Sequence, residues 1–224
     1  MYNDKIEIRD VNINGETNWY WIKEDTGSFD GPKDDWEKSH HIKFFEHVKN
    51  FDTIVTGGTS CGMYVRFYAK MFKHVYAFEP DPMIFHCMVN NCPYDNVYKL
   101  NAAMGHGNGL VGLERAPAGD HVMNIGMNRV SNPNTFKIPM LSIDSLNLDS
   151  CDVIQLDVEG FESYVIAGAQ KTIEKHKPVI IAERFDVQQG QDFMKQINYK
   201  LVGKSALDAI YIYEEPAKEF LYRV

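Results

Sequence analysis

Features that would indicate a membrane, a secreted or a nucleic-acid-binding protein are missing from this sequence. No apolar run reaches the roughly 18 residues that a transmembrane helix needs, and the N-terminal sequence MYNDKIEIRD is too polar for a signal peptide. The formal net charge is −8, so no long-range positive field attracts nucleic acid or anionic lipid. We therefore expect a cytoplasmic protein with neither nucleic acid nor a membrane as a partner.

The sequence also lacks the cysteine pattern of a disulfide framework. Cys87 and Cys92 form one close pair, and the other two of the four cysteines have no such neighbour. In a chain of 224 residues, which is long enough to bury a large core, this is typical of free buried thiols in a reducing compartment. Internal repeats and low-complexity tracts are absent too, so we expect one domain with a short extension.

That extension covers residues 1–50, which are polar and irregular. Two features stand out in it. The aromatic cluster Trp19, Tyr20 and Trp21 is a candidate lid over a substrate, with a packing role as the alternative. A helix is predicted over 34–48, where apolar residues recur at helical spacing.

From residue 51 onward, segments typical of strands and helices alternate. Strands are predicted at 52–58, 74–80, 97–105, 151–160 and 177–184, and helices at 60–72, 81–91 and 162–175. Residues 199–215 read as an antiparallel hairpin. The pattern predicts an α/β fold with a mostly parallel seven-stranded sheet, helices on both faces and the hairpin at one edge. Residues 105–134, rich in Gly, Asn and Pro, are expected to loop over the strand ends.

The junction between the first of these strands and the helix after it, TGGTSCG, has the composition of a ligand-binding turn. Gly58 and Gly62 permit a sharp turn and a close approach of the backbone to a ligand. Thr59 and Ser60 supply hydroxyls that cap the helix or bond to the ligand. Alone, this pattern is equally typical of glycines that only make a tight turn.

Glu79 ends the next strand, 21 positions after Gly58. At about this spacing in nucleoside-binding sheets, an acid accepts hydrogen bonds from both ribose hydroxyls; a solvent-exposed strand-end acid is the alternative. The usual pyrophosphate signatures, G-K-[ST] and a complete G-x-G-x-x-G, are absent. A nucleoside cofactor without a pyrophosphate suits this loop, and S-adenosylmethionine is the common one.

Six segments, in order and spacing, resemble the FkbM-type methyltransferases: VTGGTSCG, VYAFEPDP, LNAAMG, MLSIDSL, VIQLDVEGFESYVIAGA and PVIIAE. The resemblance covers about residues 51–215, and the DVEG-x-E segment followed by Gly-Ala is its most specific part. It implies a Rossmann-like class I methyltransferase domain over 51–224, with S-adenosylmethionine as cofactor. It also implies transfer of a methyl group to a hydroxyl of a sugar, a glycan or another small metabolite.

The resemblance also assigns cofactor contacts. Gly58 and Gly62 would pass under the methionine portion and Glu79 would hold the ribose, while Asn101 and Ala102 would lie near the adenine. The inferred cofactor-binding set is Thr56, Gly58, Thr59, Ser60, Gly62, Glu79, Asn101, Ala102 and Asp157.

The glycine turn within this set departs from the family pattern. The family usually has D-x-G-A-N-x-G where this chain has T-G-G-T-S-C-G, so Thr56 replaces an acid and Ser60 an asparagine. Loss of a charge-assisted hydrogen bond costs about 1.5–3 kcal/mol, which weakens cofactor binding without preventing it.

The resemblance implies that Asp157 faces the crevice beside the transferred methyl group. A methyltransferase aligns the acceptor oxygen and removes its proton, and Asp157 is our first candidate for the general base or substrate anchor. Glu183 is the second, because it ends the strand that we expect beside 152–157. We interpret Glu159 and Glu162 as acids that suit the dipole of the next helix.

Two alternatives for the chemistry stay open. The pair His40 and His41 could supply the base, although histidines on amphipathic helices more often pack or face solvent. A divalent metal ion could bind Asp157 and Glu183 together with Glu159 or His40, but we favour a site without a metal.

Two other classes of function compete with methyl transfer. One is a catalytically silent Rossmann-like module that binds a partner, a reading that Thr56 supports. The other is an NAD-type oxidoreductase, which the incomplete phosphate fingerprint disfavours.

Overall fold

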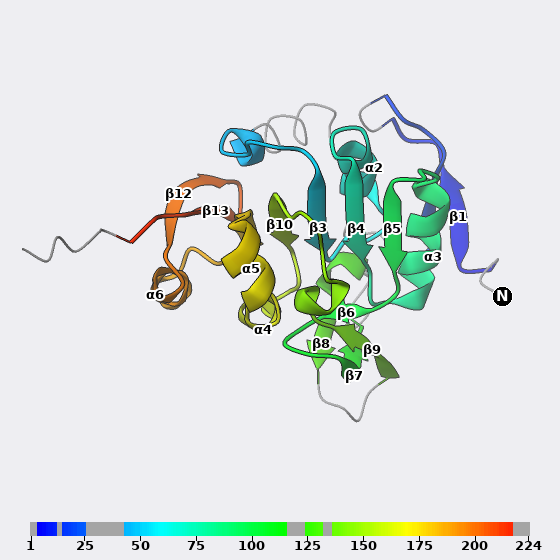
Figure 1. Cartoon of the computed structure of the whole chain (residues 1–224). Coiled ribbons are helices and arrows are strands. Elements are labelled where there is room, and N and C mark those ends of the chain that lie inside the picture. The colour runs from blue at the N-terminus through cyan, green and yellow to red at the C-terminus, as the bar shows by residue number, and fades with distance from the viewer. Residues whose placement is uncertain (1–3, 13–14, 26–42, 116–123, 132–135, 217–224) are drawn as a thin grey trace, which may run out of the picture.

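The computed structural model describes residues 4–12, 15–25, 43–115, 124–131 and 136–216. Seven strands form one sheet in the order β12-β13-β11-β10-β3-β4-β5 (Figure 1). Neighbouring strands are parallel except around β13, which pairs antiparallel with both β11 and β12. The predicted α/β fold, a mostly parallel seven-stranded sheet with a C-terminal antiparallel hairpin, is confirmed.

The strands of this sheet are β3 (Thr53–Gly57), β4 (His74–Phe78), β5 (Val97–Leu100), β10 (Val153–Leu156), β11 (Val179–Glu183), β12 (Tyr199–Ser205) and β13 (Asp208–Tyr213). The helices are α2 (Met63–Ala69), α3 (Pro82–Asn91), α4 (Glu162–Ala167), α5 (Gln170–His176) and α6 (Gln188–Gln196), with short 3-10 turns η1 (Ile125–Met127) and η2 (Ile143–Leu146).

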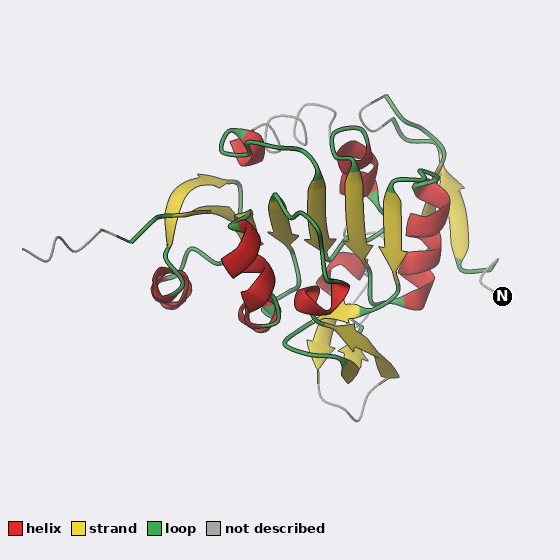
Figure 2. Ribbon diagram, in the orientation of Figure 1, coloured by secondary structure: helices red, strands yellow, loops and turns green. Residues whose placement is uncertain are grey.

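Helices cover both faces of the sheet (Figure 2). Successive residues of a strand point to opposite faces, so Ile54 packs with α2 and α3 while Val55 packs with α4, α5 and α6. Because the central strands are buried on both faces, all five residues of β3 are buried. The same burial explains why the sequence VIIAE of β11 is a nearly continuous apolar run rather than an alternating one.

The stretch 105–134 is not only loop, and the predicted strand 97–105 is not continuous. β5 ends at Leu100, and the chain then enters a second, four-stranded sheet in the order β6-β9-β7-β8. Its strands are β6 (Ala103–Met104), β7 (Gly109–Glu114), β8 (Arg129–Ser131) and β9 (Phe136–Leu141). The sequence did not predict these strands because they are short and flanked by glycine and asparagine. Their small apolar cluster forms only when the strands pair. In Figure 1 this sheet lies beyond the carboxyl ends of β3, β4 and β5.

The predicted helix over 162–175 is divided into α4 and α5 at Gly168. A Cβ on Gly168 would lie 2.0 Å from the carbonyl oxygen of Gly105, so the chain bends here against the start of the second sheet. Asp144 accepts hydrogen bonds from the amides of Lys171 and Thr172 and so caps α5. Helix α6 has no counterpart among the predicted elements, because its sequence QQGQDFMKQ has few apolar residues.

The N-terminal extension is more ordered than the sequence indicated. β1 (Ile6–Arg9) and β2 (Trp19–Ile22) form an antiparallel hairpin, which lies beside α3 (Figure 1). Trp19 and Trp21 are each 1% exposed, so the aromatic cluster serves packing. Most of the helix predicted over 34–48 lies outside the described residues, as do His40 and His41.

Two other expectations concern the whole chain. All four cysteines are free and buried, as predicted. None of the helices among the described residues is long and apolar enough to cross a membrane.

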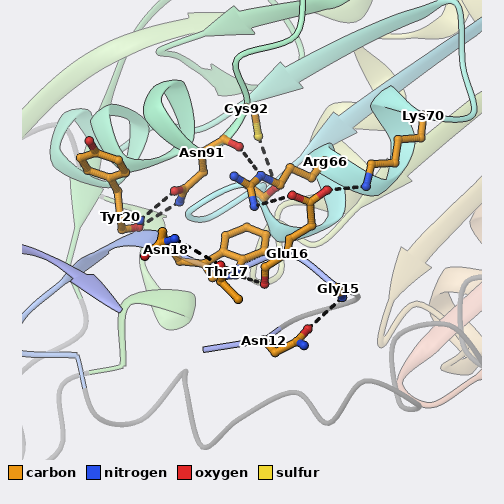
Figure 3. Close-up of polar contacts among 12 residues, drawn as sticks. Asn12, Gly15, Glu16, Thr17, Asn18, Tyr20, Arg66, Lys70, Asn91 and Cys92 are labelled. Carbon is orange, nitrogen blue, oxygen red and sulfur yellow. Dashed lines mark hydrogen bonds and ion pairs between the residues drawn. The ribbon is translucent and has the colours of Figure 1, made fainter. Parts of the chain in front are cut away.

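Polar contacts join the hairpin to helices α2 and α3 (Figure 3). Asn91, at the end of α3, accepts a hydrogen bond from the Tyr20 amide at 2.8 Å and donates to the carbonyls of Tyr20 and Cys61 at 2.9 and 2.8 Å. Arg66 of α2 forms an ion pair with Glu16 at 3.2 Å. The hairpin is therefore part of the folded unit and not a loose appendage.

Asn91→Ala should lower the free energy of unfolding by about 1–3 kcal/mol, because it leaves buried backbone groups without their partner. The measurement is urea denaturation followed by circular dichroism. Asn90→Ala is the matched control, since the Asn90 amide bonds only to the His86 carbonyl within its own helix among the contacts described. Equal destabilisation by the two variants would refute the role of Asn91.

Candidate active site

A cleft opens at the carboxyl ends of the central strands, where the direction of winding reverses. From β3 the chain moves through β4 to β5, and then returns to β10 on the other side of β3. In doubly wound sheets ligands bind at this point. The cleft contains about 540 Å³ of atom-free space, part of which is open to solvent. It is lined by Gly57, Gly58, Ser60, Phe78, Glu79, Pro80, Ala102, Ala103, Met104, Ile125, Gly126, Asn128, Val130, Asp157 and Val158.

The turn after β3 passes against β10 with no room for a side chain at Gly58. Gly58 has a φ of +75°, and a Cβ there would lie 1.6 Å from the carbonyl oxygen of Asp157. Gly62 has a φ of +89° and directly precedes α2, and a Cβ there would lie 2.7 Å from the Cys92 sulfur. Both positions therefore require glycine for steric as well as conformational reasons.

The turn is fastened to the end of β4. The Thr59 hydroxyl and amide both donate to the carbonyl of Phe78, and the hydroxyl also contacts the Met88 sulfur, so Thr59 is buried beneath the turn. Ser60 lies in the left-handed region with a φ of +48° and lines the cleft. Its amide donates to Glu79 at 2.9 Å.

Glu79 faces the cleft and not bulk water. Its residue is 4% exposed, and its two carboxylate oxygens accept hydrogen bonds from the amides of Ser60 and Asp81, each at 2.9 Å. Burial raises the pKa of Glu79 to about 8, against the opposing effect of these two bonds. Each carboxylate oxygen keeps a second lone pair, so the group can still accept hydrogen bonds from a ligand.

Asn101 and Thr56 do not line the cleft, although both were predicted to bind the cofactor. The Asn101 amide donates to the backbone carbonyls of Glu79 and Pro80 at 2.9 and 3.1 Å, which fixes the strand end that carries Glu79. Thr56 is buried in β3, and its hydroxyl donates to Gln155, its neighbour in β10. Ala102 does line the cleft.

Asp157 and Glu183 follow paired positions of β10 and β11, where Leu156 lies opposite Ala182. The adjacency of the two strands that we expected is confirmed. Carboxylate oxygens of Asp157 and Glu183 lie within 4.8 Å of each other, and burial, followed by the nearby Glu183 charge, raises the pKa of Asp157. Asp157 therefore holds a proton more tightly than an ordinary aspartate.

Further acids surround this pair. Asp208 lies opposite Glu183 in β13, and burial together with Glu183 raises the pKa of Asp208 to about 7. Burial and then Glu183 also raise the pKa of Glu159. Glu162 accepts hydrogen bonds from the amides of Val158 and Gly160, so it braces the turn after β10.

Carboxylate oxygens of Asp157, Glu159 and Glu183 lie within 4.8 Å of one another. Oxygen donors at this spacing are of the kind that bind Mg²⁺ or Ca²⁺. Glu159 thus belongs to the acidic group at the strand ends, rather than serving only the helix dipole as we expected. His40, the other ligand considered, lies outside the described residues.

The sequence missed one side of the cleft. Ile125, Gly126, Asn128 and Val130 line it, and they come from η1 and β8. The sequence indicated this side of the cleft only through composition: the Gly- and Asn-rich stretch that contains these residues was expected to lie over the strand ends.

The strand order and the glycine turn define a Rossmann-like fold of the class I methyltransferase kind. A sequence model of the methyltransferase FkbM domain matches residues 58–210, about two thirds of the chain. The chain therefore belongs to the FkbM family of S-adenosylmethionine-dependent methyltransferases. No curated protein matches the chain at a significant level.

Solved structures agree in fold. The chain is similar to methyltransferase FkbM from Methylobacillus flagellatus KT, with a TM-score of 0.51 and 17% identity over 76% of this chain and 46% of that one. It thus spans about half the length of that protein. Weaker matches include a SAM-dependent methyltransferase from Aquifex aeolicus (TM-score 0.43, 13% identity, 80% of this chain and 88% of that one). Another is a precorrin-6y C5,15-methyltransferase from Geobacter metallireducens (TM-score 0.46, 11% identity, 83% of this chain and 92% of that one).

Gly58→Ala should lower the free energy of unfolding by about 3 kcal/mol or more, because the new methyl group is placed against the Asp157 carbonyl in a strained backbone conformation. Chemical denaturation measures the change. The control is Gly107→Ala, where a Cβ meets nothing within 4 Å; it should change stability by less than about 0.5 kcal/mol. A stable Gly58→Ala variant would show that the turn can move away from β10.

Proposed function

We propose that this protein is an S-adenosylmethionine-dependent O-methyltransferase that acts on a hydroxyl of a sugar, a glycan or another small metabolite. Membership of the FkbM family carries the cofactor class. The observation that carries the site is Glu79, a buried carboxylate held by two backbone amides at the edge of a cleft that begins at a glycine turn.

The cleft has the groups that such a cofactor needs. Glu79 offers acceptors for two ribose hydroxyls, while Phe78 and Ala102 offer apolar surface for the base. Gly57 and Gly58 leave the backbone bare beneath the methionine portion. The bound sulfonium supplies an activated methyl group, so the protein has to align an acceptor oxygen and remove its proton.

Asp157 and Glu183 are suited to that second task. Glu183, whose carboxylate lies within 4.8 Å, adds to the burial that raises the pKa of Asp157. Ionised Asp157 can accept the proton of the acceptor hydroxyl, while the hydroxyl oxygen bonds to the methyl carbon and the bond from that carbon to the sulfonium sulfur breaks. A base with a raised pKa lies closer to the pKa that general-base catalysis favours near neutral pH. Methyl transfer should accordingly increase with pH as Asp157 loses its proton.

A catalytically silent module is the second candidate, and one observation favours it. Thr56 bonds to Gln155 inside the sheet and offers the cleft no charge where relatives carry an acid. Binding of S-adenosylhomocysteine is common to both candidates, whereas transfer of a methyl group belongs only to the enzyme. An NAD-type oxidoreductase would instead bind NAD more tightly than S-adenosylhomocysteine.

Binding of S-adenosylhomocysteine near pH 7 should release a proton from Glu79. The pKa of Glu79 is about 8 in the free protein, and ribose hydroxyls donate to the ionised carboxylate, which lowers its pKa. Affinity should therefore rise with pH up to about 8 and then level off. Calorimetric titration in buffers of different ionisation enthalpy measures the released protons.

Glu79→Gln is the control for this titration, because it keeps the shape of the side chain and cannot titrate. It should remove most of the proton release and weaken binding by about tenfold. Unchanged proton release in Glu79→Gln would exclude Glu79 as the group that titrates.

Asp157→Asn should reduce methyl transfer by about a hundredfold or more, because the amide cannot accept the proton. The assay follows the labelled methyl group of S-adenosylmethionine into a panel of sugars, glycans and small hydroxyl compounds. Asp149→Asn, at an exposed acid, is the matched control. Full activity of Asp157→Asn would move the base to Glu183 or elsewhere, and no transfer to any acceptor by the wild type would favour the silent module.

A further inference from the structure

The N-terminal hairpin and one wall of the cleft meet at a single buried carboxylate. Asp25 follows β2 and is 0% exposed. One oxygen of its carboxylate accepts the indole N–H of Trp21 at 2.7 Å, and the other accepts the backbone amide of Ile125 at 3.3 Å. Because Ile125 lies 100 positions further along the chain, this contact joins the extension to the segment that lines the cleft.

Apolar side chains also connect the hairpin with the segment that lines the cleft. One buried cluster contains Trp19 and Trp21 of the hairpin together with Ile125. The same cluster includes Cys61, which lies in the glycine turn between Ser60 and Gly62. A single packed unit therefore touches the hairpin, the turn beneath the cleft and the wall beside it.

The segment held by Asp25 is short, and it leads directly into β8, which pairs with β7. Asn124 accepts a hydrogen bond from the Gly126 amide at 3.0 Å, which shapes the 3-10 turn locally. Ile125 and Gly126 then line the cleft, as does Asn128 just beyond the turn. A local turn of this kind fixes its own shape but not its distance from the sheet, so longer-range contacts must set that distance.

Asp25 is itself held in place by contacts with β1 and β2. Arg9 of β1 donates to the backbone carbonyls of Asp25 and Ile22 at 2.8 and 3.1 Å, and its guanidinium lies over the Trp21 ring at 5.9 Å. The hairpin is in turn bound to α3 through Asn91 (Figure 3). The carboxylate thus projects from a fixed base toward the turn.

We propose that Asp25 is a positioning residue that holds the Asn124–Asn128 segment as a cover on the cofactor cleft. The proposal rests on the function proposed above, since the cleft must receive the nucleoside part of S-adenosylmethionine. The cover lines the same cleft as Glu79 and Phe78. With the cover in place, a bound nucleoside is enclosed between the glycine turn and Ile125, and it leaves only after the cover moves.

A residue of this kind acts mainly on the rate at which the ligand leaves. Loss of the Asp25 bond lets the cover open more often, which shortens the lifetime of the bound state. The glycine turn and Glu79 are unchanged, so the association rate changes little. A residue needed only for folding would not separate the two rates in this way.

The test compares wild type, Asp25→Ala and Asp25→Asn by surface plasmon resonance with S-adenosylhomocysteine. Asp25→Ala should raise the dissociation rate by about tenfold, with an association rate within about twofold of wild type. Asp25→Asn keeps one oxygen to accept from one of the two donors but turns its NH2 group toward the other, so its dissociation rate should lie between those of wild type and Asp25→Ala. Glu24→Ala, at the exposed neighbouring acid, is the matched control and should leave both rates unchanged.

Amide hydrogen exchange of residues 124–128 gives a second readout that needs no ligand. Exchange should be faster in Asp25→Ala than in wild type, and intermediate in Asp25→Asn. Should Asp25→Ala fail to fold, Trp21→Phe removes the indole donor that orients the carboxylate, and it should raise both the exchange and the dissociation rate to a smaller degree.

The possible failures are distinguishable. Wild type that binds no S-adenosylhomocysteine overturns the proposed function and the cover with it. Wild type that binds, with unchanged dissociation and exchange rates in Asp25→Ala, overturns the role of Asp25 alone. A fall in the association rate by the same factor as the affinity would also overturn it, because the residue would then shape the cleft rather than close it.

Discussion

The closest approach in the site is between two strand ends, and the rest of the cleft depends on it. At Gly58 the chain leaving β3 passes so near the Asp157 carbonyl that a Cβ would lie 1.6 Å from that oxygen. This contact fixes the turn beneath the cleft, and the turn in turn presents the Ser60 amide to Glu79 at 2.9 Å. Glu79 and Asp157, which follow different strands, are thereby held at one opening.

Burial of carboxylates is the second organising feature. Glu79, Asp157 and Asp208 all have raised pKa values, and loss of hydration is the first cause in each case. Because their pKa values are raised, these acids keep their protons in the folded state at pH values where the unfolded state has lost them. The free energy of unfolding therefore falls as pH rises. Ligands that donate hydrogen bonds to these acids offset that fall, which couples folding and binding at this edge of the sheet.

The position of the second sheet and of the N-terminal hairpin gives the cleft its outer wall. The common α/β sheet supplies the turn, Glu79 and Asp157, whereas η1 and β8 supply Ile125 and Val130. Because Ile125 contacts Asp25 and packs with Trp19 and Trp21, the two parts of the chain that differ most from a plain doubly wound sheet meet at the same opening.

The sequence by itself determined the sheet and its ligand-binding edge. Short apolar runs such as VIQL and VIIA predict strands buried on both faces, and the glycines at 58 and 62 with Glu79 after the next strand are local signals. The predicted adjacency of β10 and β11 followed from the alternation of strands and helices. These features depend on residues close together in the sequence, and so they could be read from it.

Only the tertiary structure decided what each polar group bonds to. Asn101 supports the backbone of Glu79 and Pro80, and Thr56 bonds within the sheet to Gln155, because the strand register brings those partners together from distant parts of the chain. The hairpin β1–β2, the second sheet and the contact of Asp25 with Ile125 arise in the same way. Short, glycine-rich or polar segments have no periodic pattern of their own, and they acquire a structure only when a distant surface covers their few apolar side chains.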